Sequence, residues 1–145
     1  MPNEVTFLFE DYVHSEWVDY NGHMNDAEYA RVFSMAVETL MNNLGIDASF
    51  REQNQYSIYT LETHLCYLAE LKQGQYFRVT VPLLDDDAKR LHVFFTMEDQ
   101  NGARVATSEQ MLMGMDMAQG RPEAFPLPIE KEIKKLAEAS EGKMI

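Results

Sequence analysis

The stretch Trp-Val-Asp-Tyr-Asn-Gly-His-Met-Asn-Asp-Ala-Glu-Tyr, residues 17–29, contains the start of a long helix. Asn25 followed three residues later by Glu28 is the pattern of an N-cap residue with its capping-box partner. Gly45 is the residue type that commonly follows a last helical turn. Between them, apolar residues recur at helical spacing, at Tyr29, Phe33, Ala36, Val37, Leu40 and Leu44. We predict a helix that begins near Asp26 and packs its one apolar face on something flat.

The segments on both sides of this helix have the character of strands. Residues 4–18 alternate in places between apolar and polar side chains, as a half-buried strand does. Four later segments are rich in β-branched or aromatic residues, and they are Tyr56–Leu68, Gln75–Leu84, Lys89–Asp99 and Ala103–Ala118. Turn-forming residues separate these segments at positions 72–74, 85–87 and 100–102. We therefore expect successive strands to pair as antiparallel hairpins.

The predicted order is strand, long helix, four strands and a short C-terminal helix over Ile129–Ser140, which follows three prolines. This order indicates an α+β fold in which one five-stranded antiparallel sheet covers one helix. The chain has 145 residues, of which 46% are hydrophobic and 25% charged, so we expect a single domain over 1–145. We also expect the C-terminal helix to be largely solvated.

Four methionines lie at alternate positions of the last predicted strand, at Met111, Met113, Met115 and Met117. Such a stripe belongs on one face of the sheet. We favour packing in the core over a role in lining a substrate site.

Composition excludes several classes of function. Twelve basic against twenty-four acidic residues give a net charge of −12, which repels nucleic acids and anionic membranes. No apolar run has the length of a membrane span, and the first residues lack a basic secretion signal, so we expect a cytoplasmic protein. The single Cys66 and four scattered histidines do not form a metal-ligand pattern, and we expect no metal and no cofactor.

The polar cluster before the long helix is the candidate for chemistry. A helix N-terminus offers unpaired backbone N–H groups that stabilise a developing oxyanion. Asp19, Asn21 and His23 precede it, and they can supply a nucleophile or base, an orienting amide and a proton carrier. Asp and Asn in this position equally often only form turns and caps. The residues alone leave both interpretations open.

Residues 17–29 resemble the hotdog-fold thioesterases related to 4-hydroxybenzoyl-CoA thioesterase. The family pattern is matched by Asp19, Gly22, His23, Asn25 and Tyr29, and the order of predicted elements fits as well. The resemblance implies that Asp19 is the catalytic carboxylate and that the backbone N–H of Asp26 is the oxyanion donor. Because some hotdog hydrolases take their carboxylate from the long helix, Glu38 is a reserve base. The family also implies a homodimer or homotetramer, with active sites at the dimer interface.

The motif is more narrowly similar to the betainyl-CoA thioesterases of carnitine breakdown. Aromatic faces and a nearby carboxylate suit a trimethylammonium group, so we assign substrate binding to Trp17, Tyr20, Asn25, Tyr29 and Glu62. Glu62 shares a strand face with His64, and a solvated or dimer-facing pair is an equal alternative. The candidates for contacts with coenzyme A phosphates are Arg31, Lys72, Lys89, Arg90, Arg104 and Arg121.

The sequence therefore predicts hydrolysis of a short acyl-CoA. Two alternatives on the same fold are a non-catalytic acyl-CoA-binding module and an acyl-CoA hydratase.

Overall fold

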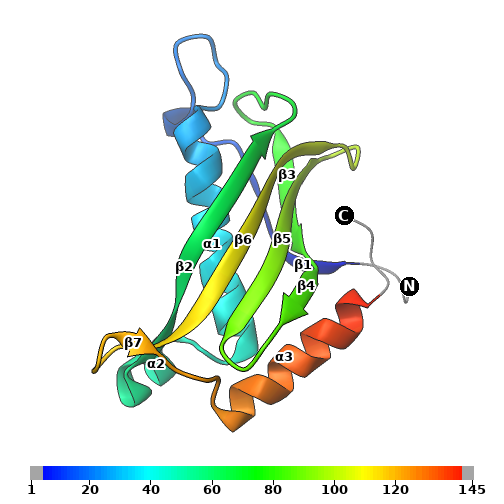
Figure 1. Cartoon of the computed structure of the whole chain (residues 1–145). Helices are drawn as coiled ribbons and strands as arrows, with labels where there is room; N and C mark the ends of the chain where they lie inside the picture. Colours follow the sequence, from blue (N-terminus) through cyan, green and yellow to red (C-terminus); the bar gives the residue numbers. More distant parts are fainter. Residues whose placement is uncertain (1–4, 142–145) are drawn as a thin grey trace.

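The computed structural model describes residues 5–141. Its long helix α1 (Asp26–Leu44) lies against a curled sheet, with the helix α3 (Leu127–Ser140) at the side (Figure 1). The remaining elements, in chain order, are β1 (Thr6–Tyr12), the 3₁₀ helix η1 (Ser15–Trp17), α2 (Ala48–Asn54), β2 (Tyr56–Tyr67), β3 (Tyr76–Val81), β4 (Leu83–Asp86), β5 (Arg90–Asp99), β6 (Arg104–Asp116) and β7 (Arg121–Pro122). No helix within 5–141 is both long and apolar enough to cross a membrane.

All strand pairs of the sheet are antiparallel, in the order β1-β3-β5-β6-β2. The predicted α+β fold is confirmed. The sheet has seven strands rather than the predicted five, because β4 also pairs with β5 and β7 with β6. The segment predicted as one strand over Gln75–Leu84 is divided at Pro82, which has no backbone N–H to donate to a neighbouring strand.

The prediction that every successive pair of strands forms a hairpin is wrong for β2 and β3. β2 pairs with β6 at the opposite side of the sheet, while β3 pairs with β1 and β5. The turns at 85–87 and 100–102 do join paired strands, with backbone hydrogen bonds of Asp87 N–H to the Arg90 carbonyl and of Asp99 N–H to the Ala103 carbonyl. The turn at 72–74 instead leads the chain from one side of the sheet to the other.

The long helix α1 begins at Asp26 and presents one apolar face to the sheet, as predicted. Val32, Phe33, Ala36 and Leu40 are almost fully buried, and the ring of Phe33 lies 6.3 Å from that of Phe95 on β5. Burying each large apolar side chain contributes roughly 1.5–3 kcal/mol, so this face fixes where both ends of α1 lie.

The predicted capping box does not form. Asn25 is the N-cap residue, but its side chain makes no capping hydrogen bond. Glu28 pairs with Arg31 one turn later, with its Oε1 3.1 Å from the arginine Nε. The first strand is also shorter than the predicted 4–18, because β1 ends at Tyr12 and η1 follows.

Helix α2 was absent from the sequence prediction. Its signal was the N-cap Asp47, whose carboxylate accepts a hydrogen bond of 2.9 Å from the Phe50 N–H. The helix has no fully buried residue, so no apolar period marks it. The C-terminal helix α3 is more buried than expected, since Ile129, Ile133 and Leu136 all lie in the core.

The expectation that the methionine stripe packs in the core is wrong. Leu112 of β6 is fully buried, whereas Met111, Met113 and Met115 are only partly buried and Met117 is exposed. Successive side chains of a strand point to opposite faces, so the residues around Leu112 that alternate with it lie on the face away from α1.

Candidate active site

The loop between η1 and α1 is held by backbone hydrogen bonds to the segment before β3. The Met24 N–H donates to the Leu71 carbonyl at 2.8 Å, and the Gln73 N–H donates to the Gly22 carbonyl at 3.1 Å. Within the loop, the Asn25 N–H donates to the Trp17 carbonyl at 2.9 Å. Gly22 has a φ of +79°, a conformation that favours glycine. These contacts fix the loop directly in front of the helix start.

Asp19 forms the turn of this loop. Its Oδ1 accepts hydrogen bonds from the backbone N–H of Asn21 at 2.8 Å and of His23 at 3.2 Å. In the described part of the chain, Oδ2 has no hydrogen-bond partner, and the side chain is partly buried. One carboxylate oxygen therefore orders the loop while the other remains available for chemistry.

The start of α1 leaves one backbone donor open. The Ala27 N–H is bonded to the Asp26 Oδ1 at 2.9 Å, and the Glu28 N–H is bonded to the Asn25 carbonyl at 3.0 Å. The Asp26 N–H has no acceptor among residues 5–141. Together with the partial positive charge of the helix N-terminus, this N–H is a preformed donor for an anionic oxygen.

His23 is oriented by a carboxylate that sequence reasoning missed. Its Nδ1 lies 3.2 Å from the Glu70 Oε2, and about a third of the His23 side chain is exposed. Glu70 lies 47 positions later in the chain, in the connection between β2 and β3, and no motif marks it. The β-bridge between His23 and Lys72 brings the two segments together.

A pocket of about 320 Å³ opens beside the helix start, and we call it the helix-start pocket. It is lined by Met24, Asp26, Tyr29, Tyr67, Leu68, Ala69 and Glu70. The Tyr67 hydroxyl donates to the Asp26 carbonyl at 3.3 Å, and the rings of Tyr67 and Tyr29 meet edge to face with centroids 5.5 Å apart. Of the predicted site residues, Asp26 and Tyr29 line the pocket and His23 reaches it through Glu70.

Tyr29 is the buried wall of this pocket. Its hydroxyl accepts a hydrogen bond of 3.1 Å from the Leu71 N–H. Burial raises the pKa of Tyr29, and the negative charge of Glu70 raises it further. The tyrosine is therefore neutral near pH 7.

The other aromatic residues of the motif lie outside the pocket. Trp17 is buried, with the His14 ring stacked on it at 4.1 Å and the Arg31 guanidinium 5.4 Å from its centroid. The Tyr20 side chain is 97% exposed. Asn21 and Asn25 are exposed as well, and neither lines the helix-start pocket.

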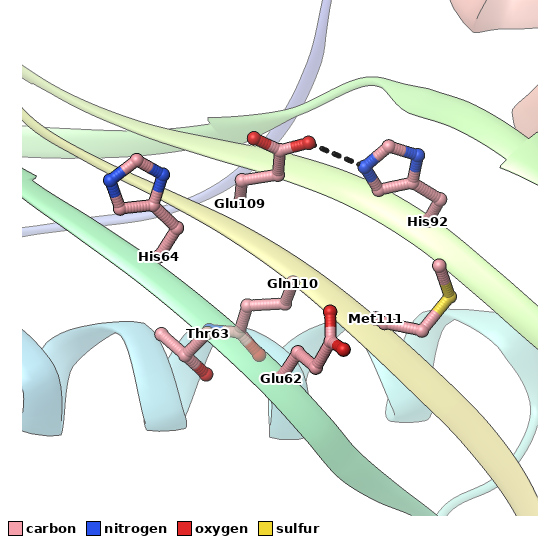
Figure 2. A pocket seen from close by; sticks show the side chains of 7 residues that line it. All are labelled: Glu62, Thr63, His64, His92, Glu109, Gln110 and Met111. Atoms are coloured by element: carbon pink, nitrogen blue, oxygen red, sulfur yellow. Dashed lines mark hydrogen bonds and ion pairs between the residues drawn. The ribbon is translucent and has the colours of Figure 1, made fainter.

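Glu62 lies in a different hollow, of about 470 Å³, on the face of the sheet away from α1 (Figure 2). We call this the outer-face hollow, and it is lined by Glu62, Thr63, His64, His92, Glu109, Gln110 and Met111. His92 Nε2 and Glu109 Oε2 are 2.7 Å apart, and Glu62 shares the face with His64 as predicted. Across residues 5–141, no group of His, Cys, Asp or Glu is arranged to hold a metal ion.

Glu38, the reserve base, is remote from the loop. It lies about three turns, or about 18 Å, further along α1 than Asp26. Its carboxylate is 4.0 Å from the Arg51 guanidinium of α2. Within one chain, the structure does not bring Glu38 or Glu62 to the helix start.

The family model of the thioesterase-like superfamily matches residues 13–138, which include the loop, α1 and the whole sheet beyond β1. The chain belongs to this superfamily. It is 39% identical over 138 residues to betainyl-CoA thioesterase of Pseudomonas aeruginosa, covering 94% of this chain and 87% of that protein. It is 38% identical to L-carnitine dehydrogenase/betainyl-CoA thioesterase of Agrobacterium fabrum, covering 93% of this chain but 28% of that larger protein.

A solved structure of a Staphylococcus aureus protein in complex with CoA superposes with a TM-score of 0.92. The two are 34% identical, and the match covers 97% of this chain and 90% of the other. The predicted hotdog fold is thus confirmed, and the protein is a thioester hydrolase of the acyl-CoA thioesterase class.

Proposed function

We propose that the thioesterase hydrolyses betainyl-CoA to glycine betaine and free coenzyme A. The observation that carries the proposal is the unpaired Asp26 N–H at the helix start, which follows a loop in which one carboxylate oxygen of Asp19 has no partner among the described residues. The names of relatives at 39% and 38% identity support the choice of acyl group.

The mechanism follows from this placement. The thioester carbonyl oxygen accepts a hydrogen bond from the Asp26 N–H, and the helix dipole stabilises the charge that develops on it. Asp19 Oδ2 either attacks the carbonyl carbon or takes a proton from an attacking water. His23, held by Glu70, and Asn21 orient the water. If water attacks, the carbon–sulfur bond breaks, the acid keeps the water oxygen, and the thiolate leaves with a proton from that water. If Asp19 attacks, the carbon–sulfur bond breaks to leave an anhydride between Asp19 and the acyl group. Water then cleaves this anhydride, which returns the Asp19 carboxylate, releases the acid and supplies the proton of the thiol.

Coenzyme A is an anion, and an acidic chain needs local cations to bind it. Two of the candidate cations lie next to the loop. The Arg31 guanidinium lies over the Trp17 ring, and Lys72 forms a backbone β-bridge with His23. We therefore assign the phosphate contacts to Arg31 and Lys72.

A second copy of the chain is part of the proposal, as a homodimer or a homotetramer of such dimers. β2 pairs on one side only among the described strands, and it exposes Tyr59, Leu61 and Tyr67. An exposed strand edge with apolar side chains is stabilised by pairing with another chain. Light scattering at micromolar concentration checks this, because a mass of 16.8 kDa with full activity contradicts it.

The test of the function is thiol release from a panel of acyl-CoA esters. We expect betainyl-CoA to react with a higher kcat/KM than its uncharged near-isostere, 3,3-dimethylbutyryl-CoA. Binding without turnover indicates an acyl-CoA-binding module instead. Modification of an unsaturated ester with its thioester intact indicates a hydratase. Equal rates for the two esters, or a preference for long-chain esters, refute the betainyl assignment and leave the thioesterase class.

A further inference from the structure

The helix-start pocket combines an aromatic ring, a carboxylate and apolar walls. The acidic and aromatic residues that line it are Glu70, Asp26, Tyr29 and Tyr67. No lysine or arginine lines it, although the chain contains twelve. A site of this composition favours a cation, because aromatic faces attract positive charge and a carboxylate neutralises it.

Trp17 and Tyr20, the other aromatic residues of the 17–29 motif, do not provide such a site. The Trp17 ring is in contact with the His14 ring, and the Arg31 guanidinium lies over it. A second cation at Trp17 would be repelled by that guanidinium. Tyr20 is 97% exposed, so it offers no enclosed surface.

The Tyr67 side chain is held next to Asp26, the residue proposed to bind the carbonyl oxygen of the thioester. Its hydroxyl donates to the carbonyl of Asp26, whose own N–H is the proposed oxyanion donor. Its ring is supported by Tyr29 at 5.5 Å, and about half of the residue remains exposed. The ring is therefore fixed against the residue that binds the thioester oxygen.

Glu70 supplies the negative charge. It is held from one side by His23, at 3.2 Å, and its side chain is 72% exposed. Glu70 and Tyr29 both line the helix-start pocket, and the negative charge of Glu70 contributes to the raised pKa of Tyr29.

The size of the substrate agrees with this arrangement. In betainyl-CoA, a single methylene separates the quaternary nitrogen from the thioester carbonyl carbon. The cation must therefore lie beside the group that holds the carbonyl oxygen. The helix-start pocket meets this condition, because Asp26 is part of its wall.

We propose that Tyr67 and Glu70 bind the trimethylammonium head of the substrate. These two residues would thereby determine the preference of the enzyme for a cationic acyl group. This inference rests on the proposed function, since it assigns specificity at the same site. Neither residue belongs to the 17–29 motif that carries the chemistry.

The experiment compares kcat/KM for betainyl-CoA with kcat/KM for 3,3-dimethylbutyryl-CoA in the full-length protein and its variants. We expect Glu70→Gln and Tyr67→Leu each to reduce the ratio of the two constants about fivefold, which is close to 1 kcal/mol. Tyr67→Phe keeps the ring and loses the hydroxyl, so it should keep most of the ratio. A variant that only disorders the loop lowers kcat/KM for both esters by the same factor, so the ratio of the two constants does not change.

Matched controls separate local effects from general ones. Glu52→Gln removes one negative charge from the exposed surface of α2, and Tyr12→Leu removes one exposed ring from β1. Both should leave the ratio unchanged. If Glu70→Gln and Tyr67→Leu leave the ratio at the wild-type value, the assignment of these residues is wrong while betainyl-CoA hydrolysis stands. If the wild-type protein itself shows no preference, the betainyl function fails and this inference fails with it.

Discussion

The helix-start pocket and the outer-face hollow both contain titratable side chains, but only the helix-start pocket adjoins an open backbone donor. The outer-face hollow is larger, at about 470 against 320 Å³, and it contains two histidines and two glutamates. Its side chains rise from β5 and β6, which are paired on both sides, and from β2, which is paired on one, and no helix start is among its lining residues. The smaller pocket adjoins the start of α1, where the Asp26 N–H is open. Titratable side chains alone do not make a hydrolase site, because the developing oxyanion needs a fixed donor.

The strongest test of this comparison is Asp19→Asn. We expect kcat to fall about 10³-fold, because the amide can neither attack nor accept a proton. The melting temperature should change little, since the asparagine Oδ1 can still accept from the N–H groups of Asn21 and His23. Thiol release and thermal melting measure the two effects. A variant that loses stability but retains its specific activity would show that Asp19 only forms the turn.

Asp26→Pro removes the proposed oxyanion donor without removing the helix. Proline is favoured at the first helical position, and Asn25 already has the extended conformation, with φ −63° and ψ 144°, that must precede it. We expect kcat to fall about 10²-fold with little change in the melting temperature. Asp26→Ala is the matched control, because it also removes the carboxylate but keeps the N–H. Equal activity of the two variants would exclude the Asp26 N–H from the reaction.

The smallest effect is expected in the outer-face hollow. The double variant His92→Asn with Glu109→Gln removes a side-chain contact of 2.7 Å between residues whose side chains are 31% and 41% exposed. Such pairs contribute about 1 kcal/mol or less, so both stability and kcat/KM should stay close to wild type. Denaturant titration and thiol release measure this. A loss of activity comparable to that of Asp19→Asn would show that the hollow takes part in the reaction.

Local sequence patterns predicted the features that depend on neighbouring residues. The start of α1, its buried face and the 100–102 turn follow from spacing over a few positions. The loop motif was found for the same reason, since Asp19 and His23 are close in sequence as well as in space.

Features that depend on distant pairing were not predictable in this way. No local sequence pattern indicates that β2 pairs with β6 rather than with β3. Tyr67, at the end of β2, contacts the start of α1 in this arrangement. Glu70 was missed because only the fold brings it to His23. The methionine stripe was assigned to the core because alternation identifies a face but does not say which face α1 covers.

The hydrogen bonds that attach the loop to the segment before β3 have a consequence for how this enzyme can diversify. They join backbone to backbone, at Met24 with Leu71 and at Gln73 with Gly22. Bonds of this kind persist when the side chains change. In the proposed site, residues 67–69 can therefore be exchanged, by evolution or by a protein engineer, to accept a new acyl group while Asp19 and the Asp26 N–H stay in register. Under the proposed assignment, Tyr67 acts only in the choice of substrate, whereas Glu70 also holds His23 and so links that choice to cleavage.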